Sequence, residues 1–132
     1  MNTTNIPDFQ KKQQILYIDH RPAKDIIAHG DNYLKAGRIF DASDAYQRAN
    51  YAPGLEKIRE IAESTGDVML FQQAMKALGR VIPEDEWNRV GQQALSLGKY
   101  TFSLYAFEKS GNESMRERVK TLIQTQGNES IL

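Results

Sequence analysis

Apolar residues recur along this chain at steps of three and four positions, the spacing that places side chains on one face of an α-helix. Between positions 22 and 36, for example, Ile26, Ile27, Tyr33 and Leu34 share such a face. The alternation of apolar and polar residues that is typical of a β-strand is nowhere sustained. The pattern therefore predicts an all-α protein.

Prolines and glycines divide this helical pattern at regular intervals. Three prolines stand where helices would begin, 31 and 30 residues apart: Pro22, Pro53 and Pro83. Three glycines stand where helices would end, 29 and 32 residues apart: Gly37, Gly66 and Gly98. We expect one domain over residues 1–132, made of helical hairpins at about 22–51, 53–81 and 83–110. A helix within 7–18 would precede them, and a capping helix at about 112–126 would follow.

The first and third hairpins also share a pattern of small and aromatic residues. When Gly37 is aligned with Gly98, Gly30 falls on Gly91 and Tyr46 on Phe107. Small residues at fixed places allow two helices to approach closely, and the rings fill the remaining space. The recurrence thus predicts a shared packing arrangement and requires no ligand.

These positions resemble the tetratricopeptide repeat. The residues of the first hairpin that match its pattern are Gly30, Tyr33, Gly37, Ala42, Tyr46 and Ala49; those of the third are Trp87, Gly91, Gly98 and Phe107. The middle hairpin departs from it, since Phe71 stands where a small residue is usual. The resemblance covers roughly residues 22–112. It implies a right-handed α-α superhelix, an α-solenoid whose first helices line a concave groove.

If the resemblance holds, a polar set of residues faces this groove. The expected groove residues are Asp31, Lys35, Glu56, Glu60, Glu63, Arg89 and Gln92. Two interpretations stay open: an acidic groove that takes a basic or polar peptide, or an ordinary solvated helix face. The Lys and Asn residues with which some relatives hold a peptide's terminal carboxylate are not evident here, where Ile27, Asp31 and Lys57 stand.

A second set of residues would add apolar area to the convex side. It comprises Phe40, Leu70, Phe102 and Tyr105. These side chains would support self-association into a homo-oligomer, or a terminal helix would fold back and cover them. Both readings stay open on the sequence alone.

The amino-acid composition limits the kinds of molecule that this protein is expected to bind. Lys plus Arg and Asp plus Glu number 17 each, so no excess of positive charge favours nucleic acid. The chain has no Cys, which fits a reducing compartment, and we expect a cytoplasmic protein. No run of 18 apolar residues occurs, so we expect no membrane contact.

Candidate chemistry is sparse. Asp25 and His29 lie four positions apart on one expected helix, but the only other histidine is His20, too few ligands for a metal site. We interpret His29 as a partly buried structural residue. The sequence predicts no metal, no cofactor and no catalytic residue. It favours a non-catalytic protein-interaction module or scaffold that binds a peptide or partner protein; the alternative is a regulatory or nucleic-acid-binding helical repeat.

Overall fold

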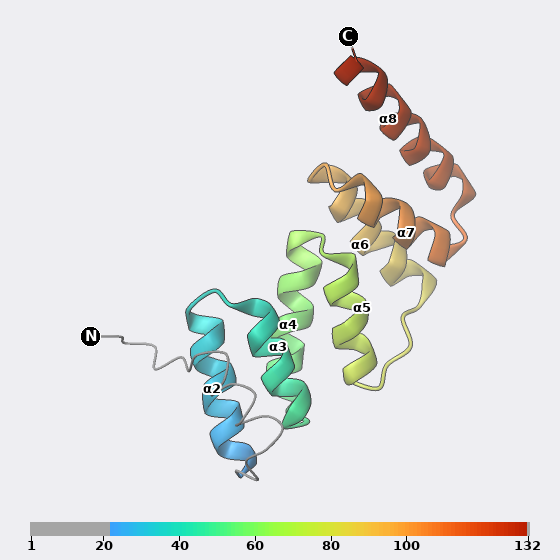
Figure 1. Cartoon of the computed structure of the whole chain (residues 1–132). Coiled ribbons are helices and arrows are strands. Elements are labelled where there is room, and N and C mark those ends of the chain that lie inside the picture. The colour runs from blue at the N-terminus through green and yellow to red at the C-terminus, as the bar shows by residue number, and fades with distance from the viewer. Residues whose placement is uncertain (1–21, 132) are drawn as a thin grey trace. The chain divides into compact units, whose positions relative to one another are not determined.

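The computed structural model describes residues 22–131, with side chains described as far as Gln126 (Figure 1). This part of the chain forms seven helices and no strand. The helices are α2 (Ala23–Lys35), α3 (Ile39–Arg48), α4 (Ala52–Thr65), α5 (Val68–Ala77), α6 (Glu84–Ser96), α7 (Tyr100–Ser110) and α8 (Glu113–Ile131). The all-α prediction is confirmed for these residues. The helix expected within 7–18 lies outside them, as does His20.

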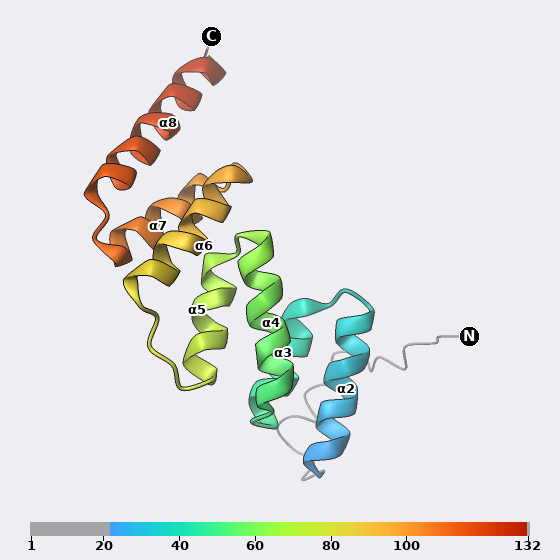
Figure 2. The ribbon, with the colours of Figure 1, turned by 180° about the vertical axis from the view of Figure 1, so that it is seen from behind.

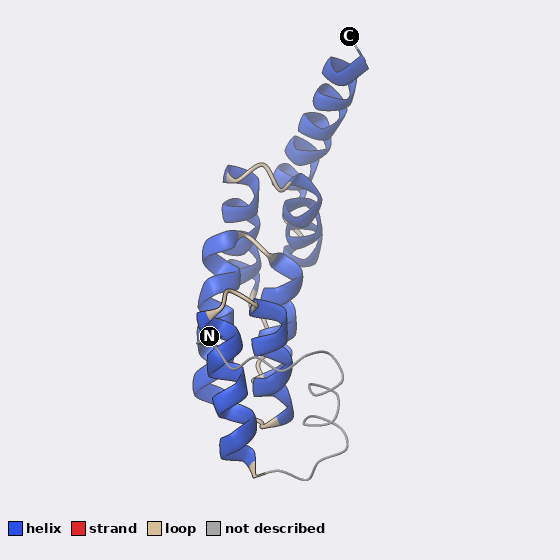
Figure 3. Cartoon of the chain, turned by 60° about the vertical axis from the view of Figure 1, so that its left-hand side comes forward, coloured by secondary structure: helices blue, strands red, loops and turns tan. Residues whose placement is uncertain are grey.

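The helices begin and end where proline and glycine predict. Pro22 and Pro83 are the residues before α2 and α6, and Pro53 is the second residue of α4. The glycines after α2, α4 and α6 take φ angles of 76°, 67° and 74°, a left-handed conformation that costs glycine little. Asp67 caps α5, since its carboxylate accepts a hydrogen bond of 3.1 Å from the Leu70 N–H. The loops that result are short (Figure 3).

Contacts divide the chain into two compact units, Met1–Ile58 and Arg59–Leu132, and the boundary falls inside α4. The sequence predicts one domain and does not mark this division, because the helical pattern runs through α4 without a break. The two units are described separately below.

In the unit up to Ile58, the ring of Tyr46 fills the space that two glycines leave. A Cβ built on Gly30 would lie 2.7 Å from Tyr46 Cε1, and one built on Gly54 only 2.5 Å from Tyr46 Cδ1. Tyr46 is fully buried, and its hydroxyl donates a 2.6 Å hydrogen bond to Asp31 Oδ1. This bond joins α3 to α2, which lie side by side (Figures 1 and 2).

The unit from Arg59 onward repeats this arrangement in α6 and α7. A Cβ on Gly91 would meet Ala106 Cβ at 3.0 Å and Phe107 Cε1 at 3.2 Å, and Phe107 is buried. The predicted equivalence of Gly30 with Gly91 and of Tyr46 with Phe107 is therefore confirmed in its packing. Helix α5 contacts both α6 and α7, and Phe71 of α5 is fully buried.

Helix α8 contacts α7, as expected of a capping helix (Figure 2). Val119 is its fully buried residue, and Met115 and Leu122 on the same stripe are half-buried. The Gln126 amide donates to the Tyr100 hydroxyl at 3.3 Å, so the contact reaches the first residue of α7. The helix extends to Ile131, beyond the end near residue 126 that the sequence predicts.

Candidate functional site: the groove between α4 and α6

The end of α4 lies unusually close to α6 because Gly66 has no side chain. A Cβ at this position would stand 2.7 Å from the Ala94 Cα, so only glycine permits the approach. Gln93 Nε2 then donates to the Ser64 carbonyl at 2.8 Å, and the Lys99 ammonium donates to the Thr65 carbonyl. Side chains from α6 and the following turn thus satisfy carbonyls that the end of α4 leaves unpaired.

The contacts between α4 and α6 also show the relative direction of the two helices. Residue numbers increase in the same direction along both helices, as the contacting pairs show: Glu63 with Arg89, Ser64 with Gln93, and Gly66 with Ala94. The C-terminal part of α4 and helix α6 therefore run in the same general direction, and one wall of the groove lies on each.

A network of charged side chains joins these two walls. The Glu63 carboxylate accepts from Arg59 Nη1 at 2.9 Å through one oxygen and from Arg89 Nε at 2.6 Å through the other. Arg89 Nη2 also lies 3.4 Å from Glu86 Oε1. One carboxylate thus pairs with guanidinium groups on both helices, an arrangement stronger than a single exposed ion pair.

Between the walls lies an open groove of about 630 Å³. The groove is lined by residues of polar or charged type, whose carbon atoms supply most of the lining surface: Arg59, Glu60, Glu63, Ser64, Arg89, Gln92 and Gln93. Two of these side chains stand apart from the network. The Glu60 side chain is 70% exposed and approaches Arg59 no closer than 3.8 Å, and the Gln92 amide is exposed with no hydrogen bond to the described residues.

Four of the expected groove residues come together here: Glu60, Glu63, Arg89 and Gln92. The other three, Asp31, Lys35 and Glu56, lie in the unit up to Ile58, and Asp31 is the hydrogen-bond acceptor of Tyr46. The groove also contains Arg59, Ser64 and Gln93, which are not among the residues expected from the sequence. The four-residue spacing of Arg59 and Glu63 on one helix could have identified the first of these.

The residues expected on the convex side differ in how exposed they are to solvent. Phe40 is 67% exposed and Phe102 is half-buried. Leu70 is only 4% exposed, a correction to the expectation that it adds apolar surface, because α5 is packed against α6 and α7. Tyr105 is half-buried: its hydroxyl donates to Gln72 at 2.9 Å and its ring meets Trp87 edge-on at 6.0 Å.

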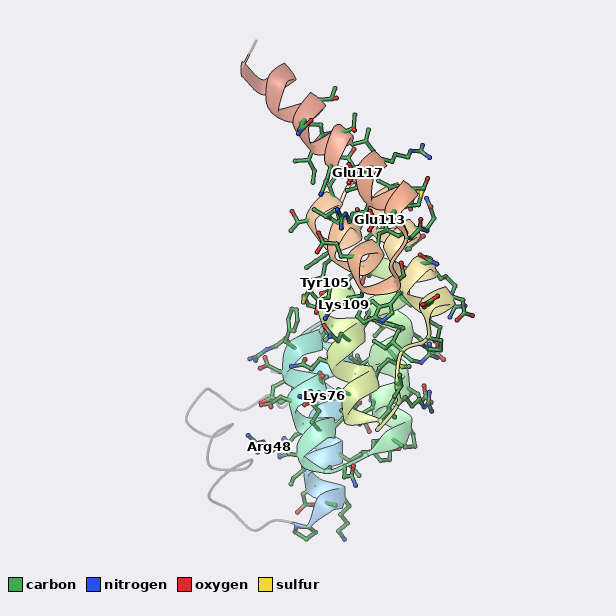
Figure 4. All side chains as sticks on the ribbon, turned by 90° about the vertical axis from the view of Figure 1, so that its right-hand side faces the viewer. Arg48, Lys76, Tyr105, Lys109, Glu113 and Glu117 are labelled. Atoms are coloured by element: carbon green, nitrogen blue, oxygen red, sulfur yellow. The ribbon has the colours of Figure 1, made fainter. Side chains whose placement is uncertain are left out.

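Lys109 covers another part of the Tyr105 ring, with its ammonium 5.4 Å from the ring centre (Figure 4). The phenol therefore has polar and aromatic neighbours within its own unit. These contacts leave less of the expected convex apolar surface than the sequence suggested.

His29 is half-buried, in keeping with its interpretation as a structural residue, and its Nδ1 is buried without a hydrogen-bond partner among the described residues. Within the described part of the chain, no three His, Cys, Asp or Glu side chains form a group that could hold a metal ion. A helix long and apolar enough to cross a membrane is also not found there. No protein-family model, curated protein or solved structure matches the chain.

Proposed function

We propose that this protein is a non-catalytic interaction module that binds an extended segment of a partner protein in the groove between α4 and α6. The observation that carries the proposal is the groove itself: an open groove of about 630 Å³ whose walls are held in place by hydrogen bonds and ion pairs across it. A binding surface that is already ordered loses little conformational entropy when its ligand arrives.

The proposal includes the repeat architecture that the sequence favours, a tetratricopeptide-like superhelix with the first helix of each hairpin on the groove side. The matching contacts of Gly30 with Tyr46 and of Gly91 with Phe107 support it. A cytoplasmic location is part of the same proposal and is supported by the absence of Cys from the sequence.

The chemistry of the groove favours a peptide over a nucleic acid. A polyanion needs cationic side chains whose charge is still available. Here the guanidinium groups of Arg59 and Arg89 already pair with Glu63. The Ser64 hydroxyl, a conceivable nucleophile, donates to the Ile61 carbonyl of its own helix.

Peptide selection tests the proposal directly. A random peptide library displayed on phage is selected on the full chain, and enriched peptides are titrated by fluorescence anisotropy against two variants. Gln92→Trp places a large ring in the groove and should weaken binding at least tenfold. Gln73→Trp, at an exposed position on α5 outside the groove lining, should not. Equal binding by both variants would disprove the groove as the site.

A further inference from the structure

The charge network in the groove separates its side chains into those that hold the walls and those that remain for a ligand. Glu63 is shared by Arg59 and Arg89, and Gln93 is bonded to the Ser64 carbonyl. These groups would have to give up bonds of 2.6–2.9 Å to contact a partner. Glu60 and Gln92 would give up almost nothing, since neither is engaged at hydrogen-bond distance.

The carboxylate of the groove that is left for a ligand is Glu60. The lining carries two carboxylates, Glu60 and Glu63, and two guanidinium groups, those of Arg59 and Arg89, and Glu63 pairs closely with both of the latter. Glu60 is the carboxylate with the longest contact, at 3.8 Å. A ligand cation could approach Glu60 more closely than Arg59 does, whereas a ligand anion would be repelled by this weakly paired carboxylate.

Gln92 offers a different kind of recognition. A primary amide has both a donor and an acceptor, the combination that matches one peptide unit of an extended chain. Because Gln92 lies on α6 and Glu60 on α4, a segment that follows the groove meets the two groups in succession.

The helix geometry gives the distance between these two groups. Glu60 precedes Glu63 by three residues and Gln92 follows Arg89 by three, and Glu63 contacts Arg89. Counted from the close approach of Gly66 to Ala94 instead, the two groups differ by four residues. At about 1.5 Å per residue, Glu60 and Gln92 are roughly 6–9 Å apart along the groove. An extended peptide advances about 3.3 Å per residue, so this separation corresponds to about two to three residues.

We infer that the groove recognises an extended peptide through a Lys or Arg side chain at Glu60 and through a backbone amide about two to three residues away at Gln92. This inference rests on the proposed function and adds the chemistry of the partner. It assigns Glu63, Arg59 and Arg89 to positioning the walls, and Glu60 and Gln92 to contact with the ligand.

The same phage selection, read for composition, tests the inference. Peptides enriched on the wild type should carry a Lys or Arg, and replacing that residue with Gln should weaken binding. The variant Glu60→Gln should weaken the basic peptides roughly two- to fivefold, the range of one exposed ion pair, and added salt should remove the difference. Glu84→Gln, an equally conservative change at an exposed position outside the groove lining, should leave the affinity unchanged.

The possible results separate the inference from the proposed function. Peptides that bind in a Gln92-dependent manner but show no basic preference, or no loss with Glu60→Gln, would overturn the inference and leave the groove as a peptide site. If Gln92→Trp leaves every enriched peptide unaffected, both fail. Enrichment of acidic peptides that depend on Arg89 would also overturn the inference, because it would show that the ligand displaces Glu63.

Discussion

Gly54 and Gly91 both leave room for an aromatic ring, but they leave different amounts of it. A Cβ on Gly54 would stand 2.5–2.7 Å from three atoms of the Tyr46 ring, closer than real Cβ contacts allow. A Cβ on Gly91 would stand 3.0–3.3 Å from Ala106 and Phe107, a distance that a small shift can accommodate. The two positions therefore form a matched pair for the same substitution.

The substitution Gly54→Ala should destabilise the protein by about 1–2 kcal/mol. Overpacking against the rigid ring costs about 1–3 kcal/mol, and the higher helix propensity of alanine offsets less than about 1 kcal/mol of this. Gly91→Ala should stay within about 0.5 kcal/mol of the wild type, because the two effects nearly cancel there. Urea unfolding followed by far-UV circular dichroism measures both. Equal effects at the two positions would contradict the close contact with Tyr46.

Tyr46 adds a second residue-scale property, a dependence of stability on alkaline pH. Burial raises the pKa of the Tyr46 phenol well above its usual value, and the hydrogen bond to the Asp31 carboxylate raises it further. In the unfolded chain the phenol titrates near its ordinary pKa of about 10. The folded state therefore retains a proton that the unfolded state loses, and stability is present below about pH 10 and falls as pH rises above it.

The loss should reach up to about 1.4 kcal/mol per pH unit for this one group. Tyr46→Phe should cost about 1–2 kcal/mol at pH 7, because a hydrogen bond to a charged acceptor is removed. Without the phenol, the variant should also lose the part of the fall in stability above pH 10 that Tyr46 causes. Tyr100→Phe is the control, since the Tyr100 hydroxyl accepts only a long bond from Gln126. Urea midpoints at pH 9 and pH 11 give the comparison, and parallel slopes for wild type and Tyr46→Phe would rule out the protonated buried phenol.

At the scale of elements, the helix boundaries could be predicted because their causes are local. Pro22, Gly37 and Asp67 act through their own backbone angles or through a neighbour three residues away. The pairing of small residues with rings could also be predicted, since it recurs at a constant offset. Neither the helix boundaries nor this pairing depends on which other helices are in contact.

The groove could be predicted only in part, because its assembly depends on contacts between residues far apart in sequence. Glu63 and Arg89 are 26 residues apart, and Lys99 and Thr65 are 34 apart. The sequence placed Glu60 and Glu63 on one face but could not show that Arg59 and Arg89 neutralise Glu63. Leu70 shows the same limit: its position in the helical pattern placed it on the convex side, whereas contact of α5 with two helices buries it.

Helix α8 gives a prediction about an element's docking. Val119 of α8 is fully buried, whereas Val81, in the loop before α6, is 90% exposed. Val119→Asp places an unpaired charge against α7 and should destabilise the docked helix by at least about 3 kcal/mol. Val81→Asp should change stability by no more than about 0.5 kcal/mol. Hydrogen exchange over residues 113–126 should accelerate in the first variant alone; unchanged exchange there would mean that Val119 does not hold α8 in place.

At the scale of the whole chain, α4 is the element that both compact units share. Leu55 and Ile58 are buried on one side of the boundary and Ala62 on the other. A helix of 14 residues is marginal without the packing of its apolar face, so loss of one unit removes part of the support of the other. This continuity favours unfolding of the two units as one cooperative event, as for neighbouring units of a helical array.

The single tryptophan makes this cooperativity measurable. Trp87 lies in α6, within the unit from Arg59 onward, whereas Gly54 lies in the other unit. If the units unfold together, Gly54→Ala should lower the midpoint of Trp87 fluorescence by the same amount as that of circular dichroism, which reports all helices. A fluorescence midpoint that stays at the wild-type value while circular dichroism becomes biphasic would show independent units. Because the substitution and the reporter lie on opposite sides of residue 58, an equal shift of the two midpoints would show that the two units unfold together.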